Sequence, residues 1–168
     1  DLPGRKEGDA WIHVGIDWLA GVVFGHVKAI GKRVLVIGGG NTAMDCCRTA
    51  RRMGGEEVSV VVRGPKSEMK ASSWEIEEAL HEDIPILDNL SPLEFVIESG
   101  RLVGMRFQPS AGDAPILIPC DEVLLAVGQM NAFPWIEADA GIDFTPQGLP
   151  VLDPLTLQSS LPQVFFGG

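Results

Sequence analysis

The chain has 168 residues, of which 45% are hydrophobic, and this is enough for one domain with a buried core. Its net charge of −10 argues against a general nucleic-acid surface or a surface for anionic membranes. Three cysteines form neither a disulfide framework nor a Cys-x-x-Cys or Cys/His metal spacing, and no signal peptide is visible, so we expect a cytoplasmic protein without a metal site.

A glycine-rich turn between a strand and a helix is the first informative feature. Residues 12–29 are mostly apolar and predict a helix or an extended connector, which leads to a buried strand at 33–37. Gly38, Gly40 and Ala43 then stand at the G-x-G-x-x-G/A spacing of a dinucleotide site, and a helix is expected from 41 to 53. The alternative is a tight turn that binds no ligand, because glycine is common in this chain.

The predicted helix at 41–53 has two different faces. Its small residues, Ala43, Cys46 or Cys47, and Ala50, are expected to face the sheet. Its arginines, at positions 48, 51 and 52, are expected to be solvated on the other side. Gly54 and Gly55 should end the helix, as glycine does at helix C-termini.

A basic group follows the second predicted strand, at 58–62. An NAD or FAD site usually has an acidic residue there for the ribose hydroxyls, but this chain has Arg63, with Lys66 and Lys70 beyond it. A cation at this place suits the 2′-phosphate of NADP. The alternative for Arg63 is a solvated charge at a strand end.

The rest of the chain completes an α/β pattern. Ser72-x-x-Glu75 is a capping box that predicts a helix over 73–82, followed by a strand at 84–87. A hairpin over 93–97 and 102–108, with a third strand at 115–118, indicates an antiparallel meander. The apolar run at 122–127 predicts a return to the central sheet, and a loop-rich segment follows. We therefore expect a Rossmann-like three-layer domain with a parallel sheet and a three-stranded antiparallel meander.

These motifs together resemble a known family. Residues 31–50, Val62-Arg63-Gly64, Glu68-Met69-Lys70-Ala71 and Ala126-Val127-Gly128 are similar to the NADPH-binding domain of FAD-dependent pyridine nucleotide oxidoreductases, in the glutamate synthase small-subunit-like group. Two departures stand out: Val62 replaces an aromatic residue, and Gly64 replaces a second arginine. One clamp on the 2′-phosphate is therefore missing, and Lys66 would have to compensate.

The resemblance implies a division of the chain and a parent protein. Residues 1–30 would be a connector from an FAD domain, 31–128 the NAD(P)H-binding domain, and 129–168 a return segment toward the FAD domain. Only one G-x-G-x-x-G/A motif is present, so we expect a fragment of a longer flavoprotein that does not hold FAD by itself and is inactive alone.

The resemblance also assigns site residues. NADP(H) would place its pyrophosphate on Gly38, Gly39, Gly40, Asn41, Thr42 and Ala43, and its adenosine phosphate on Arg63 and Lys66. Asp45 would lie near the nicotinamide, or be only a helix-surface carboxylate. Ala126, Val127 and Gly128 would line the nicotinamide path, or be only a strand end. Hydride transfer to FAD needs no catalytic side chain, and electrons would pass to an iron–sulfur or amidotransferase partner subunit.

Several other enzyme classes are excluded by missing residues. The chain has no tyrosine, so it lacks the Tyr-x-x-x-Lys pair of short-chain dehydrogenases, and it lacks the Cys-x-x-Cys of the thioredoxin-reductase type. Gly31-Lys32-Arg33 is not a P-loop, because it precedes the strand and lacks the Ser or Thr. Two rivals stay open: an NAD(P)-binding sensor or regulatory module without redox catalysis, and a Rossmann domain used only as an interface.

Overall fold

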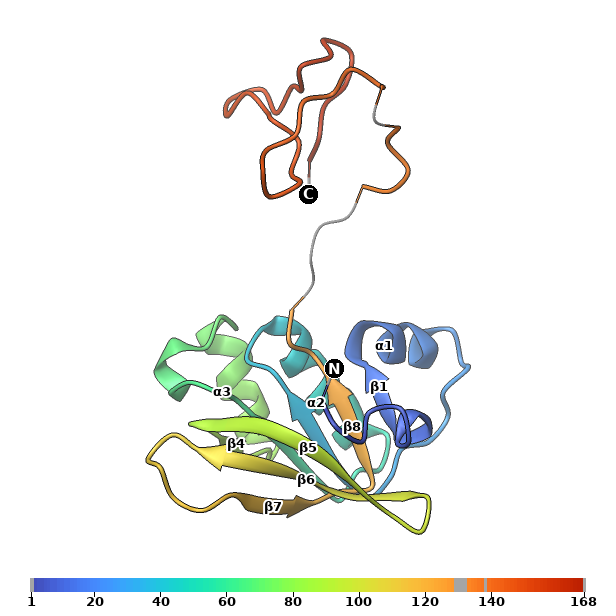
Figure 1. The fold of residues 1–168 in the computed structure, drawn as a ribbon, viewed down its shortest axis with the longest axis vertical. Helices are drawn as coiled ribbons and strands as arrows, with labels where there is room; N and C mark the ends of the chain where they lie inside the picture. The colour runs from blue at the N-terminus through green and yellow to red at the C-terminus, as the bar shows by residue number, and fades with distance from the viewer. Residues whose placement is uncertain (1, 129–132, 138, 168) are drawn as a thin grey trace. The chain divides into compact units, whose positions relative to one another are not determined.

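The computed structural model describes residues 2–128, 133–137 and 139–167. The chain divides into two compact units, Asp1–Gly128 and Gln129–Gly168. All helices and strands assigned among the described residues lie in the first unit (Figure 1).

The first unit alternates strands and helices and then forms a run of strands. Its helices are α1 (Gly15–Val23), α2 (Asn41–Arg52) and α3 (Ser73–His81), with short 3-10 turns at Asp9–Trp11 and Lys66–Glu68. Its strands are β1 (Ile12–Val14), β2 (Arg33–Ile37), β3 (Glu57–Val61), β4 (Ile86–Leu87), β5 (Leu90–Glu98), β6 (Arg101–Pro109), β7 (Ile116–Pro119) and β8 (Glu122–Leu125). Ser72 caps α3 as expected, because its hydroxyl accepts a hydrogen bond from the Glu75 amide at 3.3 Å.

Five parallel strands form the central sheet in the order β1-β8-β2-β3-β4. The last strand in sequence, β8, returns to pair with β2, with Val36 opposite Leu124, as the apolar run predicted. Residues 12–29 differ from the expectation of a helix or a connector, because Ile12–Val14 forms an edge strand beside β8 before α1 begins. A strand of three residues is too short to show an alternating pattern in the sequence. Strand β1 is therefore recognised only from its pairing with β8.

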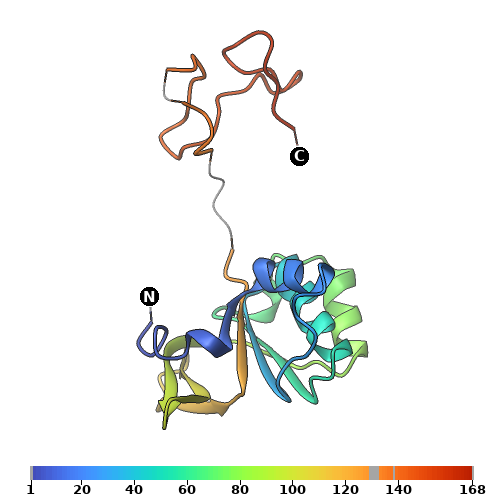
Figure 2. The same cartoon turned by 90° about the vertical axis from the view of Figure 1, so that its right-hand side faces the viewer.

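The helices cover one face of this sheet (Figure 2). The small residues of α2 face it as expected: Ala43, Cys46, Cys47 and Ala50 are fully buried in a cluster with Val34, Val36, Val60 and Leu124. Small side chains allow the helix to approach the strands closely, so the residues that follow β2 are held tightly against the sheet.

Arg48 of α2 is less solvated than the sequence indicated, whereas Arg52 is exposed as expected. The Arg48 guanidinium donates to Glu82 at 2.8 Å and to Glu78 at 3.0 Å, and its side chain is only 16% exposed. It also lies over the Trp74 ring, 5.9 Å from the centroid. Arg52 donates to Glu82 too, and Arg51 donates to backbone carbonyls of Gly55 and Glu56. The expectation failed for Arg48 because Glu78 on α3 and Glu82 just after it are brought beside α2 only by the tertiary fold.

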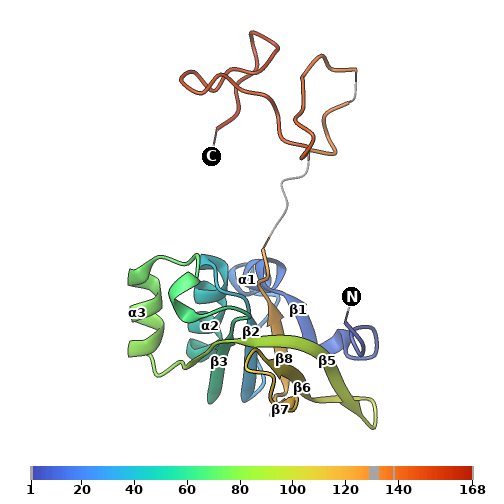
Figure 3. The same cartoon turned by 60° about the vertical axis from the view of Figure 1, so that its left-hand side comes forward.

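The antiparallel sheet β5-β6-β7 covers the other face of the parallel sheet, and Figure 3 shows β5 passing across β3, β2 and β8. Phe95, Met105 and Phe107 of this meander are buried against Leu35, Ile37 and Val123. Burying a side chain of this size contributes about 1.5–3 kcal/mol. The parallel strands are therefore covered on both sides, which confirms the expected three-layer fold.

The second unit contains turns and isolated bridges. Phe144 pairs with Pro150, Leu152 with Ser159, and Gln158 with Phe165. Residues 129–132 lie outside the described residues, so the proposed division into connector, nucleotide domain and return segment stays a prediction. No helix in the described part of the chain is both long and apolar enough to cross a membrane.

Candidate functional site

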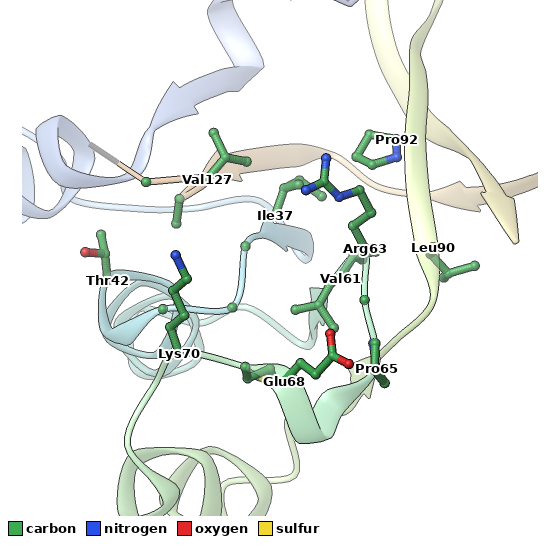
Figure 4. A pocket seen from close by; sticks show the side chains of 18 residues that line it. Ile37, Thr42, Val61, Arg63, Pro65, Glu68, Lys70, Leu90, Pro92 and Val127 are labelled. Atoms are coloured by element: carbon green, nitrogen blue, oxygen red, sulfur yellow. The ribbon is translucent and has the colours of Figure 1, made fainter. Parts of the chain in front are cut away.

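A pocket of about 700 Å³ lies where the carboxyl ends of β2, β3 and β8 meet (Figure 4). In open parallel sheets, ligands bind in the crevice outside these strand ends. The lining comes from four parts of the chain that are far apart in sequence: the glycine turn after β2, the segment after β3, the start of β5 and the residues after β8.

Gly38 begins the turn in a backbone conformation that only glycine adopts easily. Its φ is +139°, and a Cβ built on it would lie 2.1 Å from the Ala126 carbonyl oxygen. Its amide donates to the Val61 carbonyl at 3.0 Å. The protein itself therefore requires glycine at position 38, because the end of β2 lies between β3 and β8 and leaves no space for a side chain.

Gly39 connects the turn to the segment after β3. Its carbonyl accepts hydrogen bonds from the amides of Lys70 at 2.9 Å and Ala71 at 3.0 Å. A Cβ on Gly39 would lie 3.1 Å from Val62 and 3.2 Å from Met69. These contacts hold the two loops in a fixed relation at the pocket.

Gly40 differs from both neighbours, because no described atom beyond its two chain neighbours lies within 4 Å of the position where its Cβ would be. Its φ is −101°, which any residue can adopt. Neither packing nor backbone strain thus explains a glycine here, although the residue lines the pocket. A ligand that closely approaches the backbone would explain it.

The start of α2 next to Gly40 is suited to an anion. No side chain caps it, and the first amides of a helix lack acceptors within the helix. Thr42, in this first turn, lines the pocket. Phosphate groups bind well at such helix N-termini, where amides and the helix dipole act together.

Two cations extend into the pocket, Arg63 after β3 and Lys70 beside the glycine turn (Figure 4). Both are exposed, and no hydrogen bond or ion pair joins either side chain to another described residue. Glu68 is the one acidic residue among those that line the described pocket. Arg63 and Lys70 thus give the pocket two separate positive charges that have no ionic partner among the described residues.

The structure brings most of the expected site residues together. Those that line the pocket are Gly38, Gly39, Gly40, Thr42, Arg63, Ala126, Val127 and Gly128. Four others do not line it. Asn41 accepts a hydrogen bond from the Ser72 amide at 3.0 Å, and Ala43 is buried beneath the helix. Asp45 is exposed on α2, and Lys66 binds Asp88 through its backbone amide at 3.0 Å.

Sequence reasoning did not include several lining residues in the site. Lys70 and Glu68 belong to the Glu68-Met69-Lys70-Ala71 segment, so that motif was a usable signal. Leu90 and Pro92 line the pocket from β5, and they belong to no motif. Only the crossing of β5 over the parallel strands brings them to the site.

None of the three cysteines is among the residues that line the described pocket. Burial raises the pKa of Cys46 and of Cys47 to about 12, so both remain thiols at neutral pH. Within the described residues, no group of three or more His, Cys, Asp or Glu side chains is arranged to hold a metal ion. Binding at this site would therefore depend on backbone amides, the two cations and the apolar lining.

Comparisons with known sequences find longer relatives, each with a segment that is similar to this chain. It is 32% identical to the beta subunit of NADP(+)-dependent formate dehydrogenase from Moorella thermoacetica, over 99% of this chain and 26% of the relative. It is 29% identical to the small chain of glutamate synthase [NADPH] from Halomonas elongata, over 100% of this chain and 40% of the relative. The beta subunit of NADPH-Fe(3+) oxidoreductase from Geobacter sulfurreducens is 31% identical, over 86% of this chain and 24% of the relative. The chain thus spans well under half the length of these relatives.

A solved structure has the same fold. Thioredoxin reductase from T. acidophilum matches with a TM-score of 0.80 and 21% identity, over 99% of this chain and 52% of that protein. A family model described as pyridine nucleotide-disulphide oxidoreductase matches residues 8–168. Since this match includes the pocket together with nearly the whole chain, the chain belongs to the pyridine nucleotide-disulphide oxidoreductase family.

Proposed function

We propose that this chain binds NADP(H) and positions it for hydride transfer to FAD within a larger oxidoreductase. The observation on which the proposal rests is the open space over Gly40, inside a pocket and next to the uncapped start of α2. A dinucleotide pyrophosphate needs such a backbone approach and such amides. Three relatives are named for NADP(+) or NADPH, which supports the choice of nucleotide.

The lining residues divide into three groups along the proposed nucleotide. Gly39, Gly40 and Thr42 would hold the pyrophosphate, with Lys70 supplying a positive charge. Arg63 would bind the adenosine 2′-phosphate. Val127 is 74% exposed and Gly128 has open space around it, so this end of the pocket has room for a nicotinamide. Asp45 and Lys66 do not line the pocket but remain candidate cofactor-binding residues.

The nicotinamide supplies the hydride when NADPH is bound, and this chain supplies distance and orientation. The chain's own work is to hold the phosphates and to leave the nicotinamide face open to a flavin. The relatives are named as subunits or as a small chain, which supports transfer of the electrons to a partner subunit.

The test is a calorimetric titration of the chain with NADPH and NADH, compared with the Gly40→Ala variant. We expect NADPH to bind more tightly than NADH. In Gly40→Ala, affinity for both should fall by about 10- to 100-fold, because a methyl group fills the space that the pyrophosphate needs. The fold should remain, since losing glycine at this helix start costs about 1 kcal/mol or less.

Gly167→Ala is the matched control, because Gly167 also has open space around it and lies outside the pocket. Equal loss of affinity in both variants, or none in Gly40→Ala, would contradict the proposed site.

Stopped-flow reduction of bound flavin by NADPH in the complete parent protein separates an oxidoreductase from a sensor. A sensor would bind NADPH without reducing the flavin.

A further inference from the structure

Glu68 adds a carboxylate to the pocket that Arg63 also lines, and both residues follow β3. It ends the 3-10 turn Lys66–Glu68 after β3 and lines the pocket. Its Oε2 lies 3.6 Å from the position that a Cβ on Gly64 would occupy. Because residue 64 is glycine, no side chain separates this carboxylate from the end of β3.

The charge of Glu68 is not neutralised by its neighbours. No hydrogen bond or ion pair to a described side chain engages its carboxylate. The side chain of Arg63 leads away from it, toward Pro92 (Figure 4). Lys66, the cation on the same turn, does not line the pocket. The segment after β3 therefore places one positive and one negative group in the lining of the same pocket.

These two groups favour different nucleotides. A carboxylate accepts hydrogen bonds from the two ribose hydroxyls of NADH, whereas an arginine pairs with the 2′-phosphate of NADPH. The 2′-phosphate has a charge of about −2 at neutral pH and is repelled by a nearby carboxylate. A site with both groups discriminates less between the nucleotides than a site with arginine alone.

We propose that Glu68 is a specificity-determining residue that accepts hydrogen bonds from the adenosine ribose and limits the preference for NADPH. This inference rests on the proposed NADP(H)-binding function. On this inference the site accepts both reduced nucleotides. Arg63 favours NADPH, and Glu68 favours NADH.

The test is the Glu68→Gln variant, titrated by calorimetry with NADPH and NADH at low and at physiological salt. Gln keeps the size and an acceptor oxygen but removes the charge. We expect NADPH affinity to rise by about 3- to 10-fold at low salt, with a smaller gain at higher salt. NADH affinity should fall by about 2- to 5-fold, because a charge-assisted hydrogen bond becomes a neutral one.

Two controls make the result specific. Glu98→Gln removes the same charge from an exposed position at the end of β5, away from the pocket, and should leave the NADPH to NADH ratio unchanged. The second control repeats the titrations with adenosine 2′,5′-bisphosphate in place of NADPH and AMP in place of NADH, so that no nicotinamide is present. They should show the same shift in ratio if the effect arises at the ribose.

The outcomes separate this inference from the function on which it rests. If the wild-type chain binds both nucleotides and Glu68→Gln leaves their ratio within about twofold, the role of Glu68 is wrong and the site stands. An equal change in Glu98→Gln would also overturn it, because the effect would then be net charge alone. If neither nucleotide binds the wild-type chain, both the site and this inference fail.

Discussion

Two neighbouring loops form the proposed site, and they are determined by different physical constraints. The two ends of the glycine turn, residues 38–43, are fixed by packing: Gly38 fits against Ala126, and Ala43 is fully buried. The charged rim, residues 63–70, presents Arg63, Glu68 and Lys70, whose side chains have no described ionic partner. Packing therefore accounts for Gly38 and Ala43, whereas no packing contact accounts for Gly40 or for the charges on the rim.

The two loops are joined at one place, where Gly39 accepts hydrogen bonds from the Lys70 and Ala71 amides. A change in packing at the turn should therefore disturb the rim, whereas a change of charge on the rim should leave the turn intact. Substitutions in the two loops should consequently separate stability from affinity.

Gly38→Ala should give the largest effect. A Cβ 2.1 Å from the Ala126 carbonyl, on a backbone with φ +139°, forces β2 and β8 apart. We expect a loss of about 3–5 kcal/mol of unfolding free energy, measured by urea denaturation followed by circular dichroism.

Gly54→Ala is the control for that variant, because Gly54 has φ +107° with no atom within 4 Å of its Cβ position. It should lose only about 1 kcal/mol, from backbone conformation alone. Equal losses in the two variants would show that the close contact with Ala126 contributes nothing.

Arg63→Ala should leave stability unchanged and weaken NADPH binding by about tenfold, because a charge-assisted contact to the 2′-phosphate is lost. NADH affinity should stay within about twofold. Titration of both nucleotides measures this, with Arg101→Ala as an exposed control of equal charge change outside the pocket. An equal loss of affinity for NADPH and for NADH would show that Arg63 does not bind the 2′-phosphate.

Lys70→Ala should weaken NADPH and NADH alike, by about threefold to fivefold, because both have the pyrophosphate. The salt dependence of binding should also become shallower, since one screened attraction has been removed. Titrations at several salt concentrations test this. A selective loss of NADPH would assign Lys70 to the 2′-phosphate instead.

Lys66→Ala should have the smallest effect, within about twofold for either nucleotide. The sequence favoured this lysine as a second phosphate ligand, but its side chain does not line the pocket and its amide is bonded to Asp88. A large loss of NADPH affinity in the same titration would restore the original expectation.

Much of the fold was predictable because its signals are local. The strand at 33–37, the capping box at Ser72 and the hairpin around residues 98–101 each have a pattern within a few residues, and the structure confirms them. Strand β1 was missed because three residues give no period, and its partner β8 lies at the other end of the unit. Arg48 was misjudged for a similar reason, since its acidic partners are Glu78 on α3 and Glu82 just after that helix.

The sequence by itself determined the α/β order, the glycine turn and the cation at the end of the second strand, because spacing and side-chain type act over short distances. Only the tertiary structure decided which residues share the pocket. Parallel pairing brings the residues after β8 to the glycine turn, and the crossing of β5 adds Leu90 and Pro92. The fold also distinguishes the glycines: Gly38 is required by close packing, while Gly40 faces open space, and this difference depends on atoms that are distant in the chain.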